Sequence, residues 1–125
     1  MQYAIHRIIL YVHNTTLLKN FYQQHFYFHV IEEIPSEWVL LHAGGVQLAL
    51  HLAGEPFRST PPSGQPNSSN CKLVLTVTED LDAIRNRMLQ AGVPMQPIKS
   101  YLGFAYQLCD GHDPEGNVFQ LMQAI

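Results

Sequence analysis

Two segments of the chain alternate apolar and polar positions, and each is followed by apolar residues at helical spacing. The first segment, RIILYV, covers residues 7–12, and the second, KLVLTV, covers residues 72–77. Alternation with a period of two predicts a half-buried strand. Apolar positions that then recur every three or four residues predict an amphipathic helix. Each half of the chain therefore opens with the same strand–helix pair.

Polar residues mark where the two helices begin. The candidate N-caps are side chains that can accept a hydrogen bond from a backbone N–H: Asn14, Thr15 and Thr16 for the first helix, Thr78 and Asp80 for the second. Gly92, with Pro94 just beyond it, predicts the end of the second helix, because glycine takes a left-handed conformation and proline cannot continue a helix.

Three further strands are predicted in each half. In the first half they lie near residues 29–34, 37–42 and 46–52, and in the second near residues 95–98, 105–109 and 117–123. The sequence therefore predicts an α+β fold of two βαβββ modules. A stretch rich in proline, serine and asparagine, residues 55–70, predicts a linker loop. We expect one domain over residues 1–125, with modules at 1–54 and 71–125.

A tight turn precedes the last predicted strand of each half. In the second half it is DPEG, residues 113–116, which suits a type I turn because proline presets φ and the glycine takes a positive φ. Gly44 and Gly45 occupy the matching place in the first half. Both turns are predicted to join the last two strands of a module into a hairpin, and we assign them no direct chemical role.

The chain resembles the vicinal oxygen chelate superfamily of glyoxalase I, bleomycin-resistance proteins and extradiol dioxygenases. The resemblance is carried by RIILYVHNTTLLKNFYQQHF, GGVQLALH, KLVLTVTEDLDAIRNRMLQAGV and DPEGNVFQLMQ. It implies that each module curls its mixed sheet into half a barrel, and that the halves form a cleft that a homodimer often completes. It also implies a divalent metal at four positions, on the first and last strands of each module, in the metal-dependent members.

The resemblance, taken together with strand parity, implies that four residues of this chain stand at those positions: Arg7, Ala49, Lys72 and Gln120. His6 is one residue out of phase, and only a β-bulge would turn it to the same face. Two cations, a methyl group and an amide are poor ligands for a divalent ion. At an effective dielectric of ~20, a cation at ~4 Å from a divalent metal costs roughly 8 kcal/mol. We therefore expect no metal cofactor at the usual positions.

Arg7 and Lys72 occupy matching places in the two modules, so we expect them to lie near each other and to bind a small anionic molecule. His51 is the candidate catalytic base. The candidate ligand-orienting residues are Tyr11, Gln47 and Gln120, and the candidate apolar wall is formed by Trp38, Phe104 and Tyr106. The predicted function is that of a glyoxalase-like lyase or isomerase.

Alternatives remain open for each of these residues. Arg7 and Lys72 would also suit ion pairs with Glu32, Glu33 or Glu37, and His51 would suit a purely hydrogen-bonding role. A second functional hypothesis is a metal-dependent lyase or dioxygenase with a displaced site formed by His6, His51 and Gln120. A third is a non-catalytic binder such as a drug-resistance protein.

Charge and composition narrow the class of partner. The chain has 7 basic and 10 acidic residues and no Lys/Arg run, which argues against nucleic acid or an anionic membrane surface as partner. The most apolar segment, residues 38–54, is interrupted by polar residues and glycines, which argues against a membrane span. We see no signal peptide, and Cys71 and Cys109 are expected as free thiols in the cytoplasm.

Overall fold

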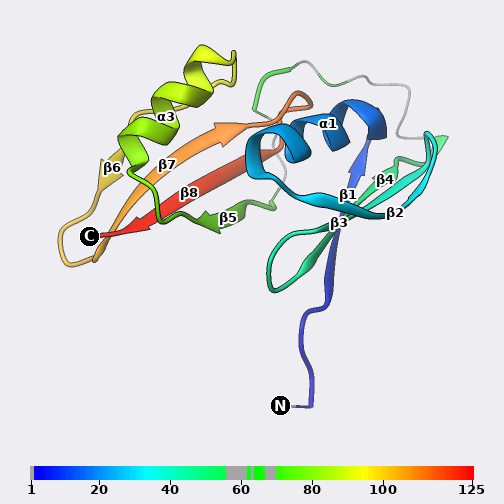
Figure 1. The fold of residues 1–125 in the computed structure, drawn as a ribbon, viewed down its shortest axis with the longest axis horizontal. Coiled ribbons are helices and arrows are strands. Elements are labelled where there is room, and N and C mark those ends of the chain that lie inside the picture. Colours follow the sequence, from blue (N-terminus) through cyan, green and yellow to red (C-terminus); the bar gives the residue numbers. More distant parts are fainter. Residues whose placement is uncertain (1, 56–61, 63, 67–69) are drawn as a thin grey trace. The chain divides into compact units, whose positions relative to one another are not determined.

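The computed structural model describes residues 2–55, 62, 64–66 and 70–125. The chain divides into two compact units, Met1–Pro62 and Ser63–Ile125. Each unit contains a four-stranded mixed sheet with one helix packed on it, so the predicted α+β fold of two βαβββ modules is confirmed (Figure 1). The predicted linker, residues 55–70, lies largely outside the described residues.

The first unit runs β1 (Arg7–Val12), α1 (Thr15–Phe26), β2 (His29–Ile34), β3 (Trp38–His42) and β4 (Gln47–Leu52). Its sheet has the order β1-β4-β3-β2. β1 pairs with β4 in parallel, and the remaining neighbours are antiparallel. The last strand therefore lies beside the first, which places residues 7–12 and 47–52 next to each other although α1 and two strands separate them in the chain.

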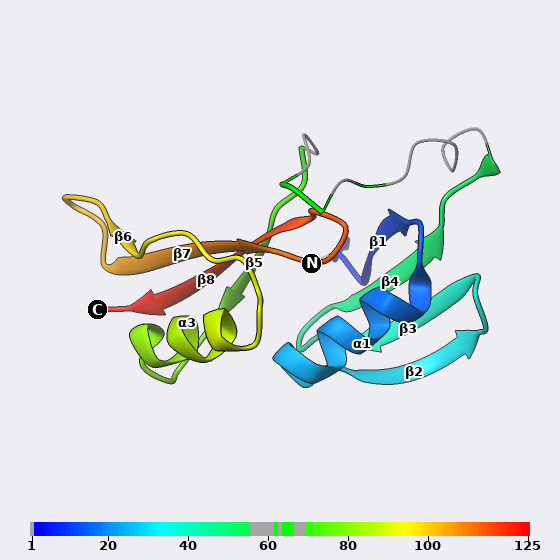
Figure 2. The same cartoon turned by 90° about the horizontal axis from the view of Figure 1, so that it is seen from above.

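The second unit repeats this topology with β5 (Leu73–Thr76), α3 (Leu81–Gln90), β6 (Lys99–Ser100), β7 (Tyr106–His112) and β8 (Val118–Ala124). Its sheet order is β5-β8-β7-β6, again with a parallel pair between the first and last strands. α1 packs against β3 and β4, and α3 packs against β7 and β8. Figure 2 shows each helix on one face of its own sheet.

Both helices begin at predicted caps. The Asn14 side chain accepts a hydrogen bond from the Leu17 N–H at 2.9 Å, and the Asp80 side chain accepts one from the Ala83 N–H at 3.2 Å. These bonds satisfy N–H groups that have no partner inside the helix. The second helix ends as predicted, with Gly92 in a left-handed conformation at φ 85°.

The core of the first unit lies between α1 and the sheet. Leu10 and Val12 of β1 are buried, as are Leu18, Phe21 and Tyr22 of α1. Burying each such side chain contributes about 1.5–3 kcal/mol. The alternating burial along β1 confirms the predicted parity, because Arg7 and the other odd-numbered positions remain exposed. The odd-numbered side chains of β1 therefore lie on the face of the sheet away from the helix.

The turn at residues 113–116 is confirmed and is anchored from within. The Gly116 N–H donates to the Asp113 carbonyl at 2.9 Å, and Gly116 has φ 86°. The buried Asp113 carboxylate also accepts from the N–H groups of Glu115 and Asn117, at 2.9 and 3.0 Å. In the first unit, the Ala43 N–H donates to the Val46 carbonyl across a turn that contains Gly44 at φ 88°.

Two strand predictions in the second unit are corrected. The prediction of a strand near residues 95–98 is wrong. Met95 forms only an isolated bridge with Gly111, and the strand found in this part of the chain is the short β6. Pro94 and Pro97 lack the N–H groups that a regular ladder needs there. β7 continues to His112, three residues beyond its predicted end, and this extension brings Asp110 into the sheet.

Candidate functional site

The open face of the first sheet, which is the face away from α1, collects most of the predicted site residues. The parallel register pairs Arg7 with Gln47, Ile9 with Ala49 and Tyr11 with His51. The register is continuous from Arg7 to Val12 and begins one residue after His6, whose carbonyl accepts from the Gln47 N–H at 2.9 Å. Arg7, Tyr11, Gln47 and His51 therefore lie on one face, as predicted from parity.

Arg7 is held by a neutral amide and an aromatic ring. Its Nε and Nη2 atoms both donate to the Gln47 Oε1 atom, at 3.1 and 2.9 Å. Its Cζ atom lies 5.6 Å from the centre of the Trp38 ring, which is cation–π distance. Two of the five guanidinium N–H groups are used in these hydrogen bonds. Neither partner carries a negative charge, and together they hold the Arg7 guanidinium in one orientation.

The guanidinium extends along the sheet from its own position. Arg7 is paired with Gln47, whereas Trp38 is paired with His51, four residues further along β4. The contact between Arg7 and Trp38 therefore carries the guanidinium in the direction of Ala49, which lies between them on the same face. A longer side chain in place of the Ala49 methyl group would compete for this path.

Three aromatic rings form a row across the open face. Tyr11, His51 and Trp38 stand on the adjacent strands β1, β4 and β3 and are paired in register. The Tyr11 and His51 ring centres are 5.4 Å apart, and those of His51 and Trp38 are 5.5 Å apart. Tyr11 is 66% exposed. We call Tyr11, His51 and Trp38 the aromatic row.

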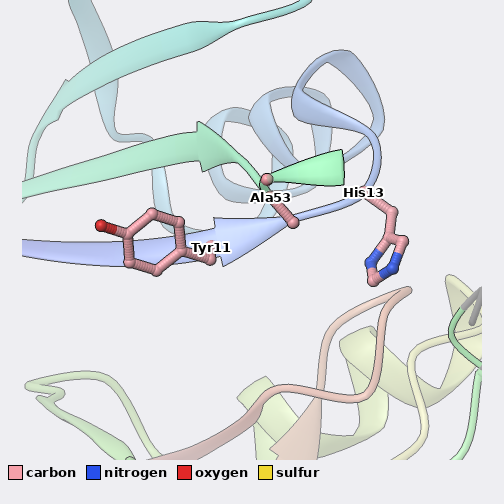
Figure 3. A pocket seen from close by; sticks show the side chains of 4 residues that line it. Tyr11, His13 and Ala53 are labelled. Carbon is pink, nitrogen blue, oxygen red and sulfur yellow. The ribbon is translucent and has the colours of Figure 1, made fainter. Parts of the chain in front are cut away.

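Two hollows border the aromatic row. One is lined by Tyr11, His13, Ala53 and Gly54, and Figure 3 shows the Tyr11 and His13 rings at its two ends with the Tyr11 hydroxyl directed away from His13. The other has a volume of about 450 Å³ and is lined by Trp38, His51, Ile34 and three glutamates, which are Glu32, Glu33 and Glu37. Glu32 accepts from Trp38 Nε1 at 3.2 Å, and Glu33 forms an ion pair with Lys19 at 3.0 Å.

The open face of the second sheet has a different electrostatic arrangement. The Lys72 ammonium forms an ion pair with the Asp110 carboxylate at 2.9 Å, and the other Asp110 oxygen accepts from Gln120 Nε2 at 2.9 Å. Burial by itself would raise the pKa of Asp110, but the hydrogen bonds from Lys72 and Gln120 and the nearby Lys72 and Lys99 charges lower this pKa overall. The positive charge of Lys72 is therefore locally compensated.

The structure thus divides the predicted site residues between the units. Arg7, Tyr11, Gln47 and His51 lie together in the first, and Lys72 and Gln120 lie together in the second. The proximity of Arg7 and Lys72 stays a prediction. Of the two interpretations of Lys72, the structure shows the ion pair, with Asp110 as partner rather than Glu32, Glu33 or Glu37.

Asp110 is the site residue that the sequence analysis missed. It was placed beyond the predicted end of its strand, whereas β7 pairs it directly with Gln120. The signal was present in the sequence, because Tyr106, Leu108 and Asp110 continue one strand face with a period of two. Of the predicted wall residues, Trp38 belongs to the aromatic row, and Phe104 and Tyr106 are exposed in the second unit.

The residues present at the family's metal positions do not fit a divalent ion. In the first unit these are a guanidinium and a methyl group, Arg7 and Ala49. In the second, the Lys72 ammonium donates to one oxygen of Asp110, and the Gln120 amide donates to the other. Among the described residues, no group of three or more His, Cys, Asp and Glu side chains is arranged to hold a metal ion.

The described part of the chain contains no helix that is long and apolar enough to cross a membrane.

Comparison with curated proteins finds no match. Among solved structures, the fosfomycin resistance protein FosX of Listeria monocytogenes has a TM-score of 0.77 at 17% identity, over 100% of this chain and 96% of that one.

Two further solved structures share the fold. Lactoylglutathione lyase from Agrobacterium tumefaciens has a TM-score of 0.72 at 18% identity, over 96% of this chain and 92% of that one. The antibiotic-binding protein TnmS3 from Streptomyces sp. CB03234 has a TM-score of 0.71 at 24% identity, over 100% and 99% of the two chains. A family model matches residues 4–121. The chain therefore belongs to the Glyoxalase/Bleomycin resistance protein/Dioxygenase superfamily.

Proposed function

We propose that this protein binds a small organic anion through Arg7 on the open face of its first sheet, without a metal ion, and acts on it as a lyase or isomerase. The observation that carries the proposal is the environment of Arg7. Its guanidinium is oriented by the Gln47 amide and the Trp38 ring, and neither partner neutralises its charge. Such a group is suited to recognise a carboxylate or phosphate.

The orientation of Arg7 lowers the cost of binding. An arginine side chain loses conformational freedom when it captures a ligand, and that loss is smaller when the side chain is already held. Gln47 and Trp38 hold it from two sides. The guanidinium keeps further N–H groups that can donate to an anion in a two-point contact. Gln47 is thus a positioning residue for Arg7.

His51 is the proposed proton-transfer group. It lies on the strand beside Arg7's strand, at the centre of the aromatic row. An imidazole can take a proton from a carbon next to a carbonyl or carboxylate and return it at a neighbouring atom. Negative charge that develops on the ligand oxygens in this step would be stabilised by the Arg7 guanidinium. Tyr11, whose ring contacts His51, would orient the ligand.

Further parts of the proposal concern the second unit, the assembly and the location. We propose that Lys72 and Gln120, held by Asp110, bind a small molecule in the second unit, that the protein is a homodimer, and that it acts in the cytoplasm. The proposed binding partner is a small molecule. The names of the structural neighbours, which include a fosfomycin resistance protein and a lactoylglutathione lyase, support a small-molecule function.

A second candidate function is binding without turnover. The observation that favours it is the hollow beside Trp38, whose three glutamates would attract a cationic part of a larger molecule. TnmS3, an antibiotic-binding protein, has the same fold. In this alternative, His51 is a wall of the binding site and transfers no proton.

Hydrogen exchange distinguishes these two functions. Chelator-treated protein would be incubated in D₂O with small carboxylates that carry a carbon-bound proton next to a carbonyl group, and deuterium uptake followed by NMR. The proposal predicts uptake that a His51→Ala variant abolishes and that a His29→Ala variant, altered at an exposed histidine of β2, retains. Binding by calorimetry without any deuterium uptake would favour the non-catalytic candidate. Absence of both binding and uptake would contradict the proposed function.

A further inference from the structure

We infer that the ligand of this site is an aromatic monocarboxylate, whose ring packs on Tyr11 and His51 while its carboxylate binds Arg7. The inference rests on the proposed anion site and names the ligand class for it. It follows from three features of the open face of the first sheet: the aromatic row, the distance from that row to Arg7, and the acidic hollow beyond Trp38.

The aromatic row is a continuous set of paired rings, and its Tyr11 end is accessible. Its ring centres are 5.4 and 5.5 Å apart, within the range of about 4.5–7 Å that aromatic pairs prefer. Tyr11 is exposed at the edge strand β1, so its ring is open to a ligand. An aromatic ring placed there gains contacts with both Tyr11 and His51 that an aliphatic group of the same size cannot reproduce in full.

The distance to Arg7 suits one ring with one carboxylate. Arg7 and Tyr11 are four residues apart on β1, which places their Cα atoms about 13 Å apart. Both side chains are long, and Ile9 lies between them on the same face as a partly exposed apolar floor. Because the Arg7 guanidinium reaches Trp38 at one end of the aromatic row, a ligand of benzoate size can contact Arg7 with its carboxylate and pack its ring on His51 and Tyr11.

The acidic hollow selects against a second negative charge. Glu32, Glu33 and Glu37 line the space next to Trp38 and His51. Lys19 compensates Glu33, which leaves net negative charge at this end of the aromatic row. A ligand with a second negative charge would carry it into a site that these glutamates border, where like charges repel. Charge complementarity thus favours a monocarboxylate with its anionic end at Arg7.

The protein contains a single tryptophan, Trp38, and it lies in the site. Its fluorescence, excited at a wavelength that the ligands do not absorb, therefore reports binding directly. We would titrate the full chain with benzoate, cyclohexanecarboxylate, terephthalate and inorganic phosphate. Benzoate and cyclohexanecarboxylate have the same charge and similar size, so the ratio of their Kd values isolates the effect of the aromatic ring.

The expected result is that benzoate binds about two- to tenfold more tightly than cyclohexanecarboxylate, with terephthalate the weaker of the two aromatic acids. A Tyr11→Leu variant should lose the preference for benzoate. A Tyr27→Asn variant should keep it, because Tyr27 is an exposed tyrosine outside the site, and asparagine tolerates its left-handed conformation.

Two outcomes would overturn the inference, and they differ in what they say about the proposed function. Equal Kd values for benzoate and cyclohexanecarboxylate, both weakened by Arg7→Met, would reject the aromatic ligand and leave the anion site intact. No binding of any of the four anions, checked by calorimetry in parallel, would reject the anion site as well.

Discussion

The two units place a cation at the same position and give it opposite surroundings. In the strand pairing, Leu40 lies opposite Ala49 in the first sheet, and Asp110 lies opposite Gln120 in the second. Arg7 therefore has the apolar, buried Leu40 where Lys72 has the carboxylate of Asp110. The Arg7 guanidinium contacts Gln47 and Trp38, whereas the Lys72 ammonium is held in an ion pair.

This difference shows that a repeated position does not fix a repeated role. The repeat in the sequence correctly places Arg7 on the open face of its sheet, and the ion pair with Asp110 places Lys72 on the open face of the other. The residue on the third strand of each sheet, Leu40 or Asp110, then decides whether the cation is compensated. The first unit therefore offers a positive charge to a ligand, and the second offers a neutral, hydrogen-bonded cluster.

The largest expected effect comes from removing each cation in turn. Arg7→Met should weaken the binding of a carboxylate about ten- to a hundredfold, because hydrogen bonds to charged groups contribute about 1.5–3 kcal/mol. Lys72→Met, the matched variant of the second unit, should weaken it by less than about threefold. Calorimetric titration of both variants with the same anion measures the two effects. Equal losses would show that the two cations act together and would remove the contrast between the units.

The next effect concerns the hairpin turns of the two units. Asp113→Ala should lower the free energy of unfolding by about 1–3 kcal/mol, because the buried Glu115 N–H and the partly buried Asn117 N–H lose an acceptor. Gly45→Ala in the first unit should change it by less than about 0.5 kcal/mol, since no atom lies within 4 Å of an added Cβ. Urea unfolding of both variants checks this, and a mild Asp113→Ala would show that the backbone turn alone is sufficient.

The smallest effect is the pH dependence of the Lys72–Asp110 ion pair. The folded protein has a lowered pKa for Asp110, so the pair contributes stability above the unfolded pKa of about 3.9 and loses it as the pH falls through the lower folded value. At pH 7 the free energy of unfolding of the wild type should exceed that of Lys72→Met by less than about 1 kcal/mol, because the Lys72 and Asp110 side chains are both partly exposed. Urea unfolding at pH 7 and at a series of pH values falling below 4 should show this difference shrink progressively in acid. A difference that grows in acid would contradict the assignment.

Features that depend on residues close together in the sequence could be predicted, and features that depend on strand pairing could not. The faces of β1 and β5 follow from a period of two, which is a local property, and the caps at Asn14 and Asp80 depend on residues three positions away. The partner of Lys72 depends on how far β7 extends before its turn. The period-two face of Tyr106, Leu108 and Asp110 is compatible with that length, but the pairing of β7 with β8 fixes it.

The contact between Arg7 and Trp38 was beyond prediction for a similar reason. It requires the register of β1 on β4 and of β4 on β3 together, and it requires a small residue at Ala49 in the path of the guanidinium. The sequence indicated only that Arg7 and Ala49 share a strand face and that Trp38 is a candidate wall residue. Their combination exists only once the three strands are side by side.

The most direct test of the central claim, that Arg7 binds an organic anion without a metal ion, is a titration at two metal levels. Chelator-treated protein would be titrated with benzoate, following Trp38 fluorescence, and the titration repeated with added nickel, zinc, manganese or ferrous ion. The account predicts one-to-one binding with the same Kd in every condition, and its loss in Arg7→Met. Binding that appears only after a metal is added would contradict the account and place a metal between the protein and its ligand.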